Sequence, residues 1–193
     1  MKKVLLVAAV AVFGLNATAQ EETTNGGFAQ GDVFITGSLG YASQSSGDSE
    51  TNHFEIAPSA GYFVSENIAL GLRIGYMSDK AEVGNTTTEE LSTLILGAFG
   101  RYYFMPADQF SIFGELGLNY LSVNNDIGGG EANGFGLALA PGISYFVSSN
   151  FALEARFGIL GYQTVEPDGG ESNDTFSFGV DMKDISLGIV YKF

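Results

Sequence analysis

Hydrophobic and polar residues alternate along most of the chain after residue 30, and turn-rich stretches separate the alternating segments. A period of two residues, rich in β-branched and aromatic side chains, is typical of β-strands. The pattern predicts an all-β chain of eight strands. These are residues 32–43, 53–64, 68–78, 91–104, 110–122, 134–147, 151–163 and 175–193, the last with a bulge near 181–184.

The predicted strands are long, and their connections alternate between short and long. Most strands have about 11–14 residues, which exceeds the usual 5–6 and suits a tilted membrane-spanning strand of about 9–11. The short connections are residues 65–67, 105–109 and 148–150; the long, polar and acidic ones are 44–52, 79–90, 123–133 and 164–174. This segregation predicts an antiparallel up-and-down meander with unlike ends.

The chain contains an internal repeat. The segment APSAGYFVSENIALGLRIG at residues 57–75 realigns with APGISYFVSSNFALEARFG at residues 140–158, an offset of 83 residues. This offset corresponds to four predicted strands. The repeat therefore predicts a closed eight-stranded sheet built from two similar halves.

The two faces of each predicted strand differ in composition. In residues 68–78 one face carries Ile68, Leu70 and Leu72, while the other carries small residues such as Ala69 and Gly71. A water-facing strand surface would be rich in charged and polar side chains, whereas small side chains suit the inside of a narrow barrel. We therefore expect the large apolar face to contact lipid and the small face to line the lumen.

The same alternation gives a face to each residue of the seventh predicted strand. Phe157 and Ile159 fall on the apolar face, and Leu160 falls on the lumen face with Arg156. Tyr162 has lumen parity, so it is expected to point inward unless a bulge intervenes.

The lumen face also carries charges of both signs, on five strands. A buried charge is costly unless it is paired and hydrogen-bonded, and a guanidinium can bind a carboxylate through two N–H groups. We predict that these charges form an ion-pair network filling the lumen; the alternative is that they are ordinary exposed strand charges. The residues are Glu55, Arg73, Arg101, Glu115, Glu154 and Arg156.

Aromatic residues gather near the strand ends on the apolar face. Two such girdles are expected where a membrane barrel meets the polar boundaries of the bilayer. At the short-turn end the predicted girdle is Tyr62, Tyr102, Phe104, Phe110, Tyr145, Phe151, Tyr191 and Phe193; at the long-loop end it is Tyr41, Tyr76 and Tyr120.

The first residues read as a targeting signal. Lys2 and Lys3 precede an apolar run, residues 4–15, that ends in a small-residue motif at 17–19. This order is typical of a secretory signal peptide, and the run is too short to span a bilayer as a helix. The predicted organisation is a signal peptide at 1–19, a polar lead at 20–30 and a barrel domain at 31–193.

Composition narrows the function classes. The chain has no cysteine, which excludes a disulfide framework, a thiolate zinc site, a cysteine nucleophile and a lipid-modified N-terminal cysteine. The formal net charge is -14, which argues against binding to nucleic acid. Charged residues are only 16%, below the roughly 25% of an ordinary soluble domain.

The last predicted strand carries the most specific resemblance. Ile189, Tyr191 and the terminal Phe193 alternate with Gly188, Val190 and Lys192, and the turn YFVS-x-N-x-AL occurs twice. The chain resembles the small outer-membrane β-barrel family, whose eight-stranded barrels are similar to the OmpA membrane domain of Gram-negative envelopes. The resemblance implies an integral outer-membrane barrel with periplasmic termini and extracellular acidic loops, and Ile189, Tyr191 and Phe193 as the signal to the barrel insertion machinery.

Three functions remain open at this stage. The leading hypothesis is a non-catalytic, monomeric structural or surface-interaction protein whose loops meet lipopolysaccharide, divalent cations or host surfaces. The alternatives are a narrow channel for small solutes and a lipid-modifying enzyme that combines His53 with Ser92 or Ser177. No cofactor or metal is predicted, because the acidic run at 166–174 lacks the spacing of a calcium loop.

Overall fold

The computed structural model describes residues 26–84, 86–180 and 185–193, which form β-strands and their connections. The predicted signal peptide at 1–19 lies outside these residues. No helix in the described part of the chain has the length and apolar character needed to cross a membrane. The strands are β1 (Val33–Ser46), β2 (Ser49–Phe63), β3 (Ile68–Val83), β4 (Thr86–Tyr103), β5 (Phe110–Asn125), β6 (Glu131–Phe146), β7 (Phe151–Phe157), β8 (Leu160–Pro167), β9 (Asn173–Phe178) and β10 (Ile185–Lys192).

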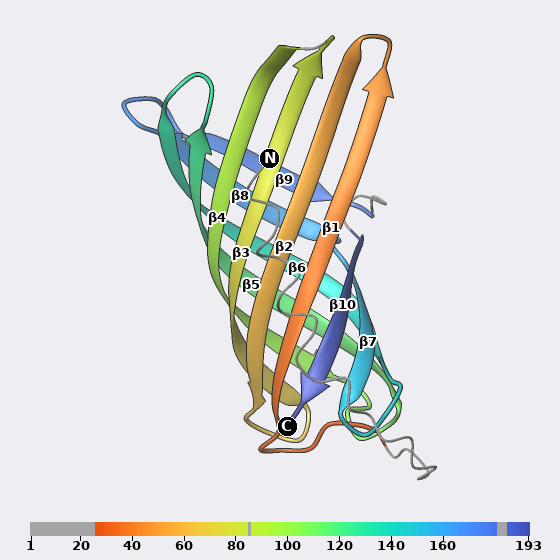
Figure 1. Cartoon of the computed structure of the whole chain (residues 1–193). Helices are drawn as coiled ribbons and strands as arrows, with labels where there is room; N and C mark the ends of the chain where they lie inside the picture. Colours follow the sequence, from red (N-terminus) through yellow and green to blue (C-terminus); the bar gives the residue numbers. More distant parts are fainter. Residues whose placement is uncertain (1–25, 85, 181–184) are drawn as a thin grey trace.

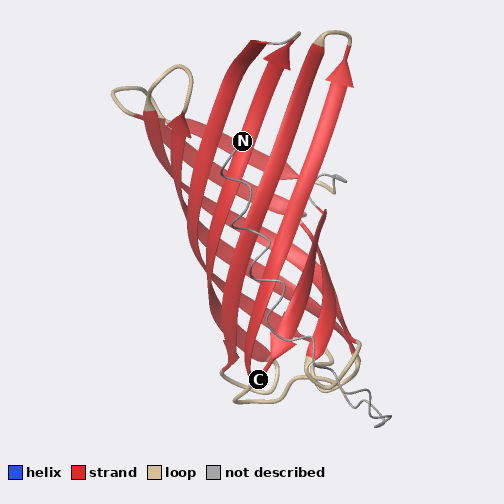
Figure 2. Ribbon diagram, viewed as in Figure 1, coloured by secondary structure: helices blue, strands red, loops and turns tan. Residues whose placement is uncertain are grey.

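The ten strands build a closed, antiparallel eight-stranded barrel (Figures 1 and 2). Strands β1 to β6 each pair with the next strand along the chain. Beside β6, the single position of a seventh strand is shared by β7 and β8. The eighth position is shared by β10 and β9, and β10 pairs with β1 to close the ring. Closure pairs the backbone of the first and last strands, which would otherwise be free edges.

The side-chain faces follow the predicted alternation over most of the wall. On β3, Leu70, Leu72 and Ile74 are exposed on the outside, and Leu72 is 69% exposed. On the inside of the same strand, Ala69 is fully buried. The large apolar side chains thus coat the outer surface, and this confirms the predicted assignment of faces.

One prediction about the seventh strand is wrong. Gly142 pairs with Arg156, but three residues earlier Leu139 pairs with Leu160. Residues 158–159 therefore add one residue to this strand, and such a bulge reverses the faces that follow it. Leu160, predicted to face the lumen, shares the outer face of Leu139, and Tyr162 is likewise outside and 43% exposed.

The eighth predicted strand is also divided. Strand β9 ends at Phe178 and β10 begins at Ile185. The bulge predicted near 181–184 lies outside the described residues. Strand β9 pairs with β8, whereas β10 pairs with β7 and β1.

The strands extend further into the long connections than the sequence predicts. Strands β1 and β2 pair up to Ser46 and Ser49, so the expected loop at 44–52 is mostly a hairpin. Strands β3 and β4 continue in the same way to Val83 and Thr86. Both hairpins rise side by side at the long-loop end of the barrel (Figure 1). Paired polar strands satisfy their own backbone groups, and a loop would leave these to water.

The internal repeat has a structural basis at the short turns. In the first copy the Ile68 amide donates to Ser65 Oγ, and in the second the Phe151 amide donates to Ser148 Oγ. The side-chain amide of Asn67 donates at 2.8 Å to the backbone carbonyl of Tyr103, the last residue of β4. The side-chain amide of Asn150 donates at 2.8 Å to the carbonyl of Lys192, the last residue of β10. The repeated residues thus build the same turn twice.

Candidate functional site

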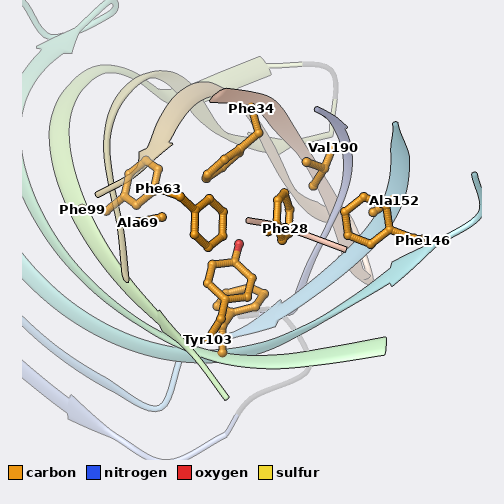
Figure 3. Packing of buried hydrophobic residues seen from close by; sticks show 10 residues of the cluster. Phe28, Phe34, Phe63, Ala69, Phe99, Tyr103, Phe146, Ala152 and Val190 are labelled. Carbon is orange, nitrogen blue, oxygen red and sulfur yellow. The ribbon is translucent and has the colours of Figure 1, made fainter. Parts of the chain in front are cut away.

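An aromatic cluster fills the lumen at the short-turn end (Figure 3). Its rings come from the N-terminal segment and from five of the barrel strands. All of them except Phe99 pack on another ring of the cluster, at centroid distances of 4.7–5.9 Å. The alternation of large and small residues predicts small side chains here, and in this part of the lumen that prediction is wrong. The aromatic members are Phe28, Phe34, Phe63, Phe99, Tyr103, Phe113 and Phe146, all at most 4% exposed.

Aromatic doublets are the signal that could have revealed this cluster. Residues 62–63, 102–103 and 145–146 are each two consecutive aromatics at the end of a strand. Successive side chains on a strand point to opposite faces. One ring of each doublet therefore joins the outer girdle, and the other, as with Phe63 and Phe146, enters the lumen.

The segment before β1 closes the barrel mouth. Phe28 stacks on Phe63 at 4.7 Å and meets Phe146 edge-on at 4.9 Å. Its backbone amide donates to the Pro106 carbonyl at 2.6 Å. Lys192 then donates to the Gly27 carbonyl at 2.6 Å, which ties this segment to the last strand. The polar lead predicted at 20–30 thus supplies a buried side chain to the barrel.

Three glycines on the lumen face make room for the rings. A Cβ added to Gly61 would overlap the ring of Phe34, and one added to Gly142 would overlap the ring of Phe113. A Cβ added to Gly71 would likewise overlap the ring of Phe99. The far end of each ring occupies the space beside a glycine of the adjacent strand, so large and small residues interdigitate across the wall.

Directly beyond the rings lies a buried ion-pair network. Glu115 on β5 accepts from Arg101 Nε and Arg73 Nη2, both at 2.7 Å, and from Arg156 Nη1 at 2.8 Å. Arg101 also pairs with Glu154 at 2.9 Å. All five side chains are at most 16% exposed. The structure thus brings together five of the six lumen charges that the sequence singled out.

The sixth charge, Glu55, is not part of the network. It has lumen parity on β2 and is half-buried, but among the described residues it makes no ion pair. It lies two residues before Ala57 and therefore nearer the long-loop end, because β2 runs from that end at Ser49 to the short-turn end at Phe63. The prediction of three acids against three bases therefore becomes two acids against three bases within the network.

Arg101 joins the network to the aromatic cluster. Its guanidinium lies 4.6 Å from the ring centroid of Phe113 and 4.9 Å from that of Phe99. It also donates to the Tyr103 hydroxyl at 3.1 Å. Cation–π contacts and charge-assisted hydrogen bonds gain strength where water is excluded. The two layers therefore form one continuous plug.

The predicted insertion-signal residues lie on the outer face of the last strand. Ile189 and Phe193 are 61% and 65% exposed. Tyr191 lies between Phe151 and Phe193, with its ring tilted against the first and edge-on to the second. The other members of the short-turn girdle are likewise on the outer face. Ile189 and Tyr191 thus lie on the outer face of β10, where Tyr191 pairs with Phe151 of β7, and Phe193 follows directly after that strand.

The candidate catalytic residues do not come together. His53 Nδ1 lies 2.7 Å from Asp79 Oδ1 on the lumen face near the long-loop end. Ser92 shares the outer face of Leu94, on the other side of the β4 wall. Ser177 donates to the Gly161 carbonyl instead. No group of three or more metal-ligating side chains is assembled within the described ranges.

The long-loop end carries exposed charges. Lys80 Nζ lies 2.6 Å from Glu82 Oε1 on the β3–β4 hairpin. The hydrogen bond from Lys80 lowers the pKa of the Glu82 carboxyl. This pair supports the ordered hairpin, and it remains in contact with water.

Known proteins share this architecture. The crystal structure of Neisserial surface protein A (NspA) is similar with a TM-score of 0.55 and 20% identity, covering 85% of this chain and 100% of that one. OprG of Pseudomonas aeruginosa is similar with a TM-score of 0.53 and 15% identity, covering 86% of this chain and 98% of that one. At these identities the likeness shows a common fold. No curated protein is significantly similar in sequence.

The sequence family described as the outer membrane protein beta-barrel domain matches residues 5–193. The match covers nearly the whole chain, and it agrees with the apolar outer surface and the closed sheet. A barrel wall that contacts lipid must present apolar side chains on its outer surface, as this one does. The protein therefore belongs to the outer membrane protein beta-barrel domain family and is a small integral β-barrel of the outer membrane.

Proposed function

We propose that this protein is a structural and surface-interaction component of the outer membrane. Its barrel acts as a sealed anchor, and its polar hairpins and loops face the cell exterior, where they meet lipopolysaccharide and divalent cations. The short-turn end and the chain termini face the periplasm. The protein acts as a monomer, with the barrel insertion machinery as its partner during assembly.

The filled lumen is the observation that carries this proposal. An eight-stranded barrel is only wide enough to be filled by its own side chains. Here the rings around Phe28 and the ion pairs around Glu115 occupy successive layers of the lumen. A solute would have to displace a buried charge network, which is costly. This arrangement favours an anchor over an open channel.

The acidic outer end supports the surface role. The four long connections hold 12 of the 22 acidic residues and a single basic residue, Lys80. Lipopolysaccharide carries phosphate groups, and divalent cations bridge phosphates and carboxylates. A polar, acidic surface above an apolar belt thus suits contact with the cation-bridged headgroup layer.

Conductance in planar lipid bilayers tests the sealed anchor. We expect no stable openings from the wild-type protein. Stable openings whose ion selectivity changes in Arg73→Ala or Arg101→Ala would instead establish the channel. A lipid A mass shift on expression, lost in His53→Ala, would establish the enzyme.

Cysteine labelling tests the proposed orientation of the barrel in the membrane. Because the sequence has no cysteine, a thiol reagent would react at the introduced residue alone. Ser46→Cys places a thiol at the β1–β2 turn, and Ser149→Cys places one at a short turn. A membrane-impermeant maleimide should label Ser46→Cys in intact cells and Ser149→Cys only after the outer membrane is permeabilised. The opposite pattern would reverse the proposed orientation.

A further inference from the structure

We propose that the lumen holds a small monovalent anion, of halide size, in the cavity beside Arg156. Among the described residues the network holds two carboxylates against three guanidinium groups, and the anion supplies the missing negative charge. This site lies within the barrel and is independent of the surface role proposed above.

The described part of the network carries more positive than negative charge. Within residues 26–84, 86–180 and 185–193, Arg73, Arg101 and Arg156 pair with two carboxylates, those of Glu115 and Glu154. Exposed fractions are 1% for Arg101 and 4% for Glu115. An uncompensated charge at such burial is strongly disfavoured. A bound anion would balance the described network.

The arginines do not use all of their N–H donors within the described network. A guanidinium carries five N–H donors. Among the described residues, Arg156 uses Nη1 alone, toward Glu115. Arg73 uses Nε and Nη2, toward Ser59 and Glu115. Arg156 therefore retains Nε and Nη2 for a further acceptor.

Arg156 lines a cavity in the lumen, beside the ion-pair network. The cavity has a volume of about 20 Å³, which is enough for one small occupant and too little for phosphate or sulfate. Hydroxyl groups from three strands border it, together with the guanidinium of Arg156. The hydroxyl residues are Thr36 and Ser38 on β1, Ser59 on β2 and Ser186 on β10.

The chemistry of this lining favours an anion over a cation. Hydroxyls and guanidinium N–H groups donate hydrogen bonds. Ser59 Oγ already accepts from Arg73 Nε at 3.2 Å, which leaves its own O–H free to donate. Glu154 also borders the cavity, but Arg101 pairs with both of its carboxylate oxygens. A halide ion can accept from several such donors at once.

Access comes from one side. The aromatic cluster closes the short-turn end, where Phe28, Phe63 and Tyr103 are at most 2% exposed. The anion therefore enters from the long-loop end, which in our proposed orientation is the cell exterior. Chloride is the obvious physiological halide for this position.

Halide-dependent unfolding tests the site. Protein folded in lipid vesicles is unfolded with urea in sodium bromide or sodium gluconate at equal ionic strength, since gluconate exceeds the cavity volume. We expect the urea midpoint to rise saturably with bromide. Arg156→Gln should weaken the apparent bromide affinity at least tenfold, whereas Lys80→Gln, which removes a charge from the outer hairpin, should leave it unchanged.

Two further measurements keep the result decisive. If Arg156→Gln does not fold, Ser186→Val fills the cavity with methyl groups and should abolish the bromide effect. Crystals grown in bromide should show an anomalous peak between Arg156 and the hydroxyls. Equal midpoints in bromide and gluconate, or a bromide effect that Arg156→Gln and Ser186→Val leave intact, would overturn the proposal.

Discussion

Arg73 and Arg156 occupy equivalent positions in the two copies of the repeat, and both donate to one oxygen atom, Glu115 Oε1, at 2.7 and 2.8 Å. They reach it from β3 and β7, on either side of β5 around the ring. Two similar halves thus converge on a residue that belongs to only one of them.

This shared acceptor predicts a cooperative loss. With either arginine removed, the other still satisfies Glu115 Oε1; with both removed, that oxygen is left without either donor. We expect Arg73→Gln with Arg156→Gln to destabilise the barrel by more than the sum of the single changes, by roughly 0.5–3 kcal/mol. Urea unfolding from lipid vesicles gives the four free energies of the cycle, and simple additivity would contradict the shared contact.

Removal of the Glu115 carboxylate is expected to lower the free energy of unfolding strongly. Glu115→Gln leaves three buried guanidinium groups, with Glu154 as their one ion-pair partner in the described part of the chain. Loss of one partner of a buried ion pair costs about 3–5 kcal/mol. Glu154→Gln should cost less, because Arg101 keeps Glu115. Glu66→Gln, at an exposed short turn, serves as the control. Equal unfolding free energies for Glu115→Gln and Glu66→Gln would show that the network contributes no stability.

The lipid-facing wall can be tested at Leu72. This residue lies midway along the apolar stretch of β3, so an arginine there would be close to the bilayer midplane. Leu72→Arg should lower the unfolding free energy by about 2–4 kcal/mol. Gln44→Arg, on the polar outer hairpin, should be nearly silent in the same titration. A silent Leu72→Arg would contradict the assignment of the outer face.

Two glycines on adjacent strands form a matched pair. A Cβ on Gly142 would overlap the Phe113 ring, whereas one on Gly114 would meet nothing within 4 Å. Gly142→Ala should therefore destabilise by about 1–3 kcal/mol through overpacking. Gly114→Ala should be neutral or slightly stabilising, since glycine is disfavoured in strands by about 0.5–1 kcal/mol. If the two variants had the same urea midpoint, the packing of the ring against Gly142 would be in doubt.

The N-terminal plug can be tested at Phe28. Truncation of a buried phenylalanine costs about 3–5 kcal/mol, so Phe28→Ala should clearly lower the unfolding free energy. Gln30→Ala, two residues away and exposed, controls for changes in the same segment. A Phe28→Ala barrel as stable as the Gln30→Ala barrel would mean that the segment contributes nothing to the closed mouth.

Several features follow from the sequence alone. Alternation of side chains assigned the outer and inner faces on β1 to β7, because the period of a strand is independent of its partners. The repeat at an offset of 83 residues predicted two similar pairs of strands around matching turns. The parity of Arg73, Arg101, Glu115, Glu154 and Arg156 placed all of them in the lumen.

Other features required the tertiary structure. Parity gives the face of a residue but not its height, which depends on the stagger between strands; this is why Glu55 shares the lumen face without joining the network. The bulge at residues 158–159 reverses the faces of β8 and brings Leu160 and Tyr162 outside, since one extra residue shifts every later side chain. The burial of Phe28 depends on a closed barrel mouth, which exists only after the first and last strands have paired.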